Sequence, residues 1–266
     1  MSAPAPTGAP LVWSGSRPDE VVWHDLECGS YHADLPLWRA LSALNLGPIL
    51  DIGAGTGRVA LALAAAAGAV SALDLDPVLL GALSERGAHA PVQTVCADAR
   101  SFQLARRDFA LCLVPMQTIQ LLGGSAQRIA FLRCARAHLR PEGLLACAVL
   151  TRVDCFDCAR GDIGPAPETA RVNGRLYVSR PTRVCANGGR VRIERERAIL
   201  IDGQRAVADR GRRAPLWSEL NVIELDRLSG SELELEGAVA GLRAEPAWHV
   251  PDTAEHLGST VVMLRA

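Results

Sequence analysis

The sequence contains no lysine, and all 28 of its basic residues are arginines. This absence excludes both a lysine that forms a Schiff base with a substrate and the lysine of a phosphate-binding P-loop. The formal net charge is only −1, so the chain has no excess of basic residues with which to bind nucleic acid. The composition therefore points away from nucleic-acid partners and from P-loop chemistry.

Long apolar runs are also missing. No run approaches the length of about 20 residues that crosses a bilayer, and residues 1–10 lack the basic start and apolar centre of a signal peptide. We expect a soluble, cytoplasmic protein that does not associate with membranes. Its 49% hydrophobic content is enough to bury a full core, in one domain or in one domain plus an elaboration.

Patterns that bind metal are scarce. Several of the eight cysteines lie in apolar strand-like runs, where cysteine acts as a small hydrophobic residue. Cys155 and Cys158 form one C-x-x-C, which could hold a metal or a soft substrate such as a trivalent arsenical. A zinc site usually needs a second pair or nearby histidines. We expect free thiols and no metal site.

The chain does contain a regular alternation of apolar strands and helical patterns between residues 49 and 150. These strands have no polar face, which is typical of a parallel sheet covered by helices on both sides. Right-handed crossovers then give a doubly wound α/β domain. We expect this core at 48–150, preceded by an N-terminal helical lid at 1–47 and completed by a helix and two strands at 228–266.

Residues 151–227 differ from the preceding core in composition and in their pattern of apolar residues. Residues 151–170 are rich in Pro, Gly and Asp and are expected to form a loop. Two runs that alternate apolar and polar residues, 176–185 and 191–201, are joined by Ala-Asn-Gly-Gly, which indicates a hairpin. A third strand is expected at 221–225. The sequence thus predicts a small antiparallel cap that lies over the ligand site.

The strongest local signal is Ile49 to Arg58, which reads Ile-Leu-Asp-Ile-Gly-Ala-Gly-Thr-Gly-Arg. Alternate glycines permit a tight turn and bring the backbone close to a ligand. A nicotinamide fingerprint needs its third glycine one position later, where this chain has Arg58. Asp51, two residues before the first glycine, would repel a pyrophosphate but suits a cationic amine. We expect a positively charged ligand.

This stretch resembles the first motif of the class I S-adenosylmethionine-dependent methyltransferases, and later motifs follow in the family's order. Asp74 matches the acid that holds both ribose hydroxyls, with Leu75 beside the adenine, and Asp98 matches the acid that accepts from the adenine amino group. Residues 139–143 match the turn before the fifth strand. The resemblance implies a Rossmann-like methyltransferase fold with a mostly parallel seven-stranded sheet, S-adenosyl-L-methionine as cofactor and a small-molecule acceptor.

The resemblance also implies a set of cofactor-binding residues. Asp76 is a rival to Asp74, but Pro77 follows it, and a helix cap is the better interpretation. An N-terminal helix covers the methionine end of the cofactor in many small-molecule members. Arg39 could therefore pair with the cofactor carboxylate or be a surface arginine on a packing helix. The predicted set is Tyr31, Arg39, Asp51, Gly53, Gly55, Gly57, Asp74, Leu75, Asp98, Ala99 and Val114.

The residues that would bind the methyl acceptor are less clearly indicated by the sequence. Residues 114–122 lack the Asn-Pro-Pro-aromatic motif of amide and adenine methyltransferases and the Pro-Cys of cytosine C5 enzymes. Family members that act on amino-sugar nucleotides commonly carry a histidine here, where this chain has Leu121. Gln117 and Gln120 could orient a polar acceptor. Among His32, His249 and His256, the last is the preferred general base, because its loop should approach the site. The predicted catalytic residues are His256 and Gln117.

Three hypotheses follow. The first is methyl transfer to O, N or C of a small, specialised metabolite in a biosynthetic pathway. The second is an S-adenosylmethionine-binding enzyme of the same fold that catalyses a rearrangement or cyclisation instead. The third is a binding protein without activity, which the presence of all three acids disfavours. Exposed strands in the cap could also pair two chains into a homodimer.

Overall fold

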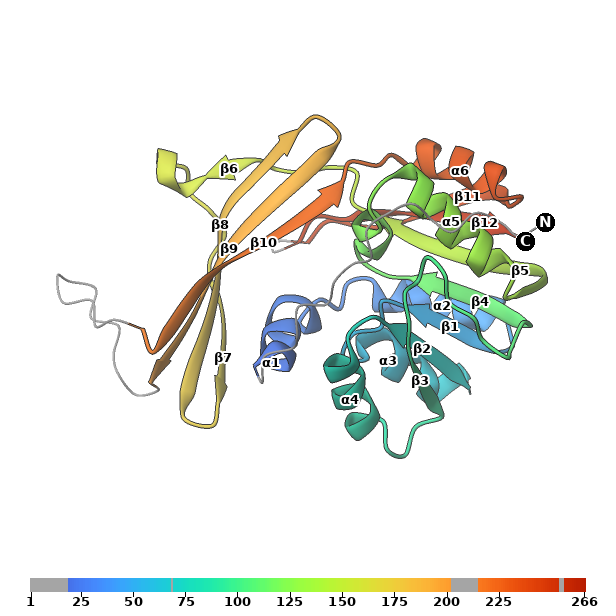
Figure 1. Cartoon of the computed structure of the whole chain (residues 1–266), viewed down its shortest axis with the longest axis horizontal. Helices are drawn as coiled ribbons and strands as arrows, with labels where there is room; N and C mark the ends of the chain where they lie inside the picture. The colour runs from blue at the N-terminus through green and yellow to red at the C-terminus, as the bar shows by residue number, and fades with distance from the viewer. Residues whose placement is uncertain (1–18, 68, 202–214, 254–255) are drawn as a thin grey trace.

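The computed structural model describes residues 19–67, 69–201, 215–253 and 256–266, which form two adjoining sheets (Figure 1). Predictions for residues 1–18 and 202–214, at the start of the expected lid and within the expected cap, lie outside the described residues. The helices are α1 (Glu20–His24), α2 (Leu35–Leu44), α3 (Arg58–Ala67), α4 (Pro77–Arg86), α5 (Ser125–Arg136) and α6 (Gly230–Val239). None of the described helices has the length and apolar character needed to cross a membrane.

The large sheet has seven strands in the order β11-β12-β5-β4-β1-β2-β3. Strands β1 to β5 run parallel, and β12 lies antiparallel between β5 and β11. This arrangement confirms the predicted doubly wound, mostly parallel sheet. Its strands are β1 (Ile49–Ile52), β2 (Val70–Asp74), β3 (Val92–Cys96), β4 (Phe109–Val114), β5 (Leu139–Val149), β11 (Arg243–Val250) and β12 (Ser259–Arg265).

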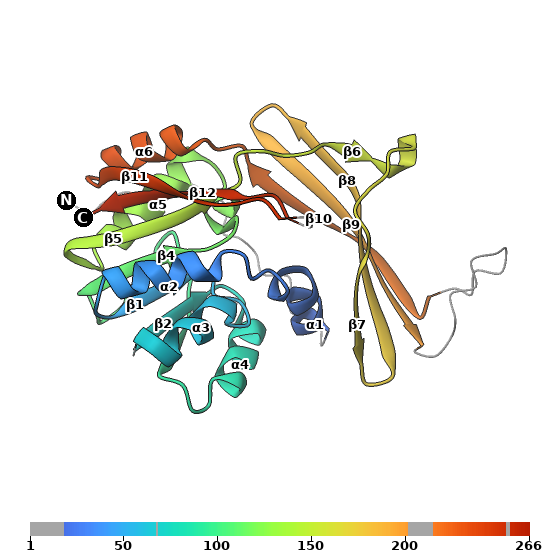
Figure 2. The same ribbon diagram turned by 180° about the vertical axis from the view of Figure 1, so that it is seen from behind.

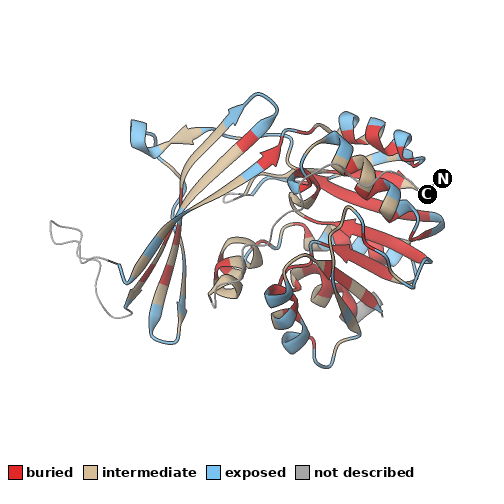
Figure 3. Cartoon of the chain, viewed as in Figure 1, coloured by how far each residue is buried: buried red, intermediate tan, exposed pale blue. Residues whose placement is uncertain are grey.

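Helices cover both faces of this sheet, and its central strands are buried throughout (Figure 3). One apolar cluster joins the sheet to α5 and α6 through Phe131 and Leu233. A second, on the opposite face, joins it to α2 and α3 through Trp38 and Leu63 (Figure 2). The central strands therefore have no polar face, because neither side of the sheet meets water along them.

The second sheet is the predicted antiparallel cap, with strand order β10-β9-β8-β6 and β7 paired to β8. The hairpin is present, and its turn holds Gly188 at φ 57°. Part of the expected loop at 151–170 is instead β6, a single 3-10 turn (η3, Cys158–Arg160) and the start of β7, because the long β8 offers these segments backbone partners. The cap strands are β6 (Phe156–Asp157), β7 (Glu168–Val172), β8 (Arg175–Asn187), β9 (Arg190–Ile201) and β10 (Trp217–Asp226).

Residues 20–29 lie between the two sheets (Figures 1 and 2). Helix α1 continues directly into one π-helical stretch, η1 (Asp25–Gly29). Its buried Trp23 and Leu26 pack with Tyr177 and Ile199 of the cap. A 3-10 turn, η2 (Thr118–Leu121), follows β4 and lies near the end of β10. These two segments separate the cap from the carboxyl ends of the central strands.

Candidate cofactor-binding site

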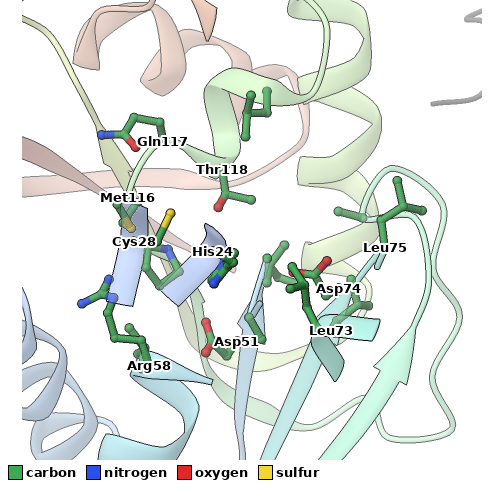
Figure 4. A pocket seen from close by; sticks show the side chains of 18 of the residues that line it. His24, Cys28, Asp51, Arg58, Leu73, Asp74, Leu75, Met116, Gln117 and Thr118 are labelled. Carbon is green, nitrogen blue, oxygen red and sulfur yellow. The ribbon is translucent and has the colours of Figure 1, made fainter. Parts of the chain in front are cut away.

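A cavity of about 350 Å³ opens where β1, β2 and β4 end, beneath α1 and η1 (Figure 4). In open α/β sheets, ligands bind beyond the carboxyl ends of the strands, at the point where the strand order reverses. Here that point lies between β1 and β4. The volume falls in the range of small-molecule sites. Its polar and charged lining residues include His24, Asp51, Arg58, Asp74, Asp98, Gln117 and Thr118.

Asp51 is the last residue but one of β1. Its side chain is buried, and neither of its carboxylate oxygens has a hydrogen-bond partner among the described residues. Burial raises the pKa of Asp51 to about 7, although the guanidinium of Arg58 acts in the opposite direction. A buried carboxylate without a partner is unfavourable in a folded protein. Because Asp51 also lines the cavity, it is suited to accept hydrogen bonds from a ligand's ammonium group.

The raised pKa of Asp51 gives a prediction about stability. Folding favours the protonated form of this side chain, so its stabilising contribution is complete below the unfolded pKa and is lost as the pH rises to about 7. We expect the unfolding free energy of wild-type protein, relative to Asp51→Asn, to fall between pH 4 and pH 7, approximately the unfolded and folded pKa values. Urea titrations of ligand-free protein across this interval measure it. A difference that does not vary with pH would contradict the prediction.

The glycine turn leaves no space for side chains. Gly53, Gly55 and Gly57 have φ values of +71°, +53° and +94°. A Cβ on Gly53 would stand 2.6 Å from Cγ2 of Thr118, and one on Gly55 would stand 2.3 Å from Nε2 of His24. Both the backbone conformation and the close approach therefore require glycine at these positions.

Asp74, at the end of β2, is held toward the cavity by the backbone. Its Oδ2 accepts from the amide of Gly55 at 2.8 Å, and its Oδ1 accepts from the amide of Asp76 at 2.9 Å. Asp76 itself accepts from the amides of Val78 and Leu79 and caps α4, as predicted. The two neighbouring acids therefore have different tasks, and only Asp74 lines the cavity.

Asp98 follows β3, the edge strand of the sheet, and lines the cavity together with Leu75 and Ala99. Hydrogen bonds from the guanidinium of Arg100 lower the pKa of Asp98 and keep it ionised. This part of the cavity combines apolar contacts with one carboxylate. That combination suits a planar heterocycle that carries an amino group.

Four other predicted residues are not among those that line the cavity: Tyr31, Arg39, Val114 and His256. Tyr31 is buried between the guanidinium of Arg58, 5.3 Å from its ring centre, and the ring of His256, at 5.0 Å. Arg39 is exposed on α2 and is not a lining residue. The arginine at the cavity is Arg58, which donates to the carboxylate of Asp34 at 2.8 Å. Val114 is fully buried where β4 ends.

The structure also brings to the cavity residues that sequence reasoning missed: His24, Cys28, Arg58, Met116 and Thr118. The sequence predicts no ligand contact for Arg58, although its place directly after the glycines is a usable signal. His24 and Cys28 belong to short helical turns without a motif. Gln120 is buried and binds backbone groups of Leu150 and Asp226, so it holds η2 in place rather than facing an acceptor.

Within the described ranges, no group of three or more His, Cys, Asp or Glu side chains could hold a metal ion. All eight cysteines are free in the structure. Cys155 and Cys158 are exposed at the outer part of the cap, next to β6.

Comparisons with known proteins agree with this geometry. Residues 49–143 match a family model described as a methyltransferase domain. A search of curated protein sequences found no match. Among solved structures, a sugar N-methyltransferase from Streptoalloteichus sp. ATCC 53650 has 17% identity and a TM-score of 0.70, with 99% of each chain covered. An amino pentose methyltransferase from Micromonospora echinaspora has 19% identity and a TM-score of 0.65, covering 95% of this chain and 98% of its own.

A third similar structure is the CcbJ methyltransferase from Streptomyces caelestis, with 21% identity, a TM-score of 0.62, and coverage of 90% of this chain and 97% of its own. At these identities the structures establish a shared fold, whereas the family model identifies the core. Residues 49–143 thus form a methyltransferase domain, and the chain as a whole has the Rossmann-like fold of S-adenosylmethionine-dependent methyltransferases.

Proposed function

We propose that this protein transfers a methyl group from S-adenosylmethionine to an amine nitrogen of a small, sugar-like metabolite. The observation that carries the cofactor assignment is the buried carboxylate of Asp51, which has no hydrogen-bond partner among the described residues and lines the same cavity as Asp74. The cofactor carries an ammonium group and vicinal hydroxyls, and these are the groups that two such carboxylates bind.

Different lining residues would bind different parts of the cofactor. Asp51 would accept from its ammonium group, Asp74 from its ribose hydroxyls and Asp98 from its adenine amino group, with Leu75 and Ala99 against the ring. When bound, the cofactor supplies an electrophilic methyl group on a sulfonium. The protein's task is then to orient the acceptor and exclude water, and such positioning can lower a barrier by roughly 7 to 11 kcal/mol.

The acceptor would enter between the cavity and the cap, past Met116, Gln117 and the half-exposed Leu121. Nitrogen is favoured as the acceptor atom because a neutral amine can attack without a strong base, and the segment after β4 has no histidine. Two proteins of similar fold support this choice, since one is a sugar N-methyltransferase and the other is a glycopeptide N-methyltransferase. Gln117 would orient the acceptor, and His256, packed on Tyr31, would take up a proton where one is released.

The test is incubation of the purified protein with S-adenosylmethionine labelled in its methyl group and a panel of amino sugars and their nucleotide conjugates. We expect mass spectrometry to find the labelled methyl group on one of these amines, together with adenosylhomocysteine. Protein with Asp51→Asn serves as the control and should transfer far less. Bound but unconsumed cofactor, with an acceptor that is rearranged rather than methylated, would favour the non-methylating alternative. Failure to bind either cofactor form would contradict the proposal.

A further inference from the structure

The segment formed by α1 and η1 joins the cap to the cofactor cavity. Residues four apart on a helix share a face, and two such pairs point in different directions here. Trp23 and Glu27 contact the cap sheet, whereas His24 and Cys28 line the cavity. Figure 4 shows the ring of His24 in the cavity with Asp51 and Asp74. His24 is thus the histidine that the tertiary structure supplies to this site.

The hydrogen bonds of His24 identify its tautomer. The hydroxyl of Thr56 donates its single hydrogen to Oδ1 of Asp25 at 2.7 Å. The same hydroxyl oxygen lies 3.3 Å from Nδ1 of His24, so Nδ1 is the donor of that second contact. A neutral His24 therefore carries its hydrogen on Nδ1 and leaves Nε2 as an acceptor. Burial lowers the pKa of His24, which favours the neutral form even though Asp74, Asp25 and Glu27 act in the opposite direction.

Nε2 of His24 and the carboxylate of Asp74 both lie close to Gly55. A Cβ on Gly55 would stand 2.3 Å from Nε2, and the amide of Gly55 donates to Asp74. Two acceptors thus converge on one corner of the cavity. A ligand that presents hydroxyl hydrogens satisfies both of them, whereas a phosphate or carboxylate satisfies neither.

A buried ion pair fixes the segment that carries His24. Nε and Nη2 of Arg197, on β9, donate to the two carboxylate oxygens of Glu27 at 2.8 and 2.7 Å. The hydroxyl of Ser179 also donates to Glu27 at 2.8 Å. The Arg197 guanidinium lies 5.4 Å from the ring centre of Trp23, the residue next to His24. Both partners of the pair are less than a tenth exposed, at 6% and 7%.

Resting on the proposed function, we propose that His24 is a further cofactor-binding residue, whose Nε2 accepts a hydrogen bond from a ribose hydroxyl beside Asp74. The Glu27–Arg197 pair positions it. The cap therefore contributes to cofactor affinity through α1 and η1, although none of its described residues lines the cavity.

The experiment is calorimetric binding of adenosylhomocysteine and of its 2′-deoxy and 3′-deoxy analogues to wild-type protein and to His24→Ala. A single hydrogen bond corresponds to a loss of about three- to tenfold in affinity, and we expect this loss for adenosylhomocysteine. One of the two analogues lacks the hydroxyl that His24 binds. Wild-type protein and His24→Ala should have equal affinity for that analogue. His24→Gln, which keeps a hydrogen-bonding group, should lie between them.

Arg197→Met tests the positioning role. It should weaken adenosylhomocysteine binding in wild-type protein but cause no further loss in the His24→Ala background, a non-additivity that general destabilisation would not produce. Arg190→Met, on the same strand but exposed and paired with Glu224, is the matched control and should bind normally.

The outcomes separate this inference from the proposed function. Wild-type binding with an unchanged affinity for His24→Ala would overturn the role of His24 alone. An equal loss for adenosylhomocysteine and both deoxy analogues would do the same, because the loss would then be unrelated to a hydroxyl. Wild-type protein that binds no adenosylhomocysteine would overturn the proposed function, and this inference with it.

Discussion

Replacing Arg128 with methionine should lower the free energy of unfolding by about 3 to 5 kcal/mol, because it leaves two buried carboxylates without their cation. Arg128, on α5, donates to both oxygens of Glu236 at 2.8 and 2.7 Å and to Asp226 at 2.6 Å. All three side chains are buried or nearly so. Asp226 ends β10 and Glu236 lies on α6, so this cluster joins the cap to the core.

Urea unfolding measures this loss, provided that the slope of the unfolding free energy against urea concentration is the same in variant and wild type. Arg133→Met is the matched control, since Arg133 is exposed on the same helix and its loss should change stability by no more than about 0.5 kcal/mol. Adding Glu236→Gln to Arg128→Met should restore part of the stability, because one of the two uncompensated charges is removed. A loss below about 1 kcal/mol for Arg128→Met would show that water reaches the cluster.

Replacing Asp74 with alanine should weaken binding of adenosylhomocysteine at least tenfold. The carboxylate is fixed by the amides of Gly55 and Asp76 and lines the cavity. Hydrogen bonds from ribose hydroxyls to a carboxylate are charge-assisted, and each typically contributes about 1.5 to 3 kcal/mol. The loss of two such bonds exceeds the 1.4 kcal/mol or so that corresponds to a factor of ten.

The neighbouring acid gives the control. Asp76→Ala removes the cap of α4 and should cost about 1 kcal/mol of stability, yet leave the affinity nearly unchanged. Calorimetry on both variants therefore separates a cofactor contact from a structural role two residues away. If Asp74→Ala binds as tightly as the wild type, Asp74 does not belong to the cofactor site.

The cofactor half of the cavity could be predicted because its residues have fixed places relative to the strands. Asp51 is the last residue but one of β1, Asp74 is the last residue of β2, and Asp98 follows β3. Parallel neighbours bring these ends to one edge of the sheet. The strand order thus places all three acids in one cavity, and each is a lining residue.

The opposite wall could not be predicted in this way. The sequence allows Arg39 to pair with the cofactor carboxylate, but Arg39 is exposed on α2, and Arg58 lies at the cavity instead. The short α1 and η1 have no sequence signature. Their placement depends on Trp23 packing against Tyr177 and on Glu27 meeting Arg197, residues more than 150 positions apart in the chain.

The sequence by itself determined the order of the strands and helices, the glycine turn and the acids at the strand ends, because each depends on local periodicity, on backbone conformation or on the register of a parallel sheet. Only the tertiary structure decided that His24 rests on Gly55 and that the cap reaches the cavity through Glu27 and Arg197. These contacts join segments by side-chain packing and buried charge pairing, and no local pattern in the sequence encodes either one.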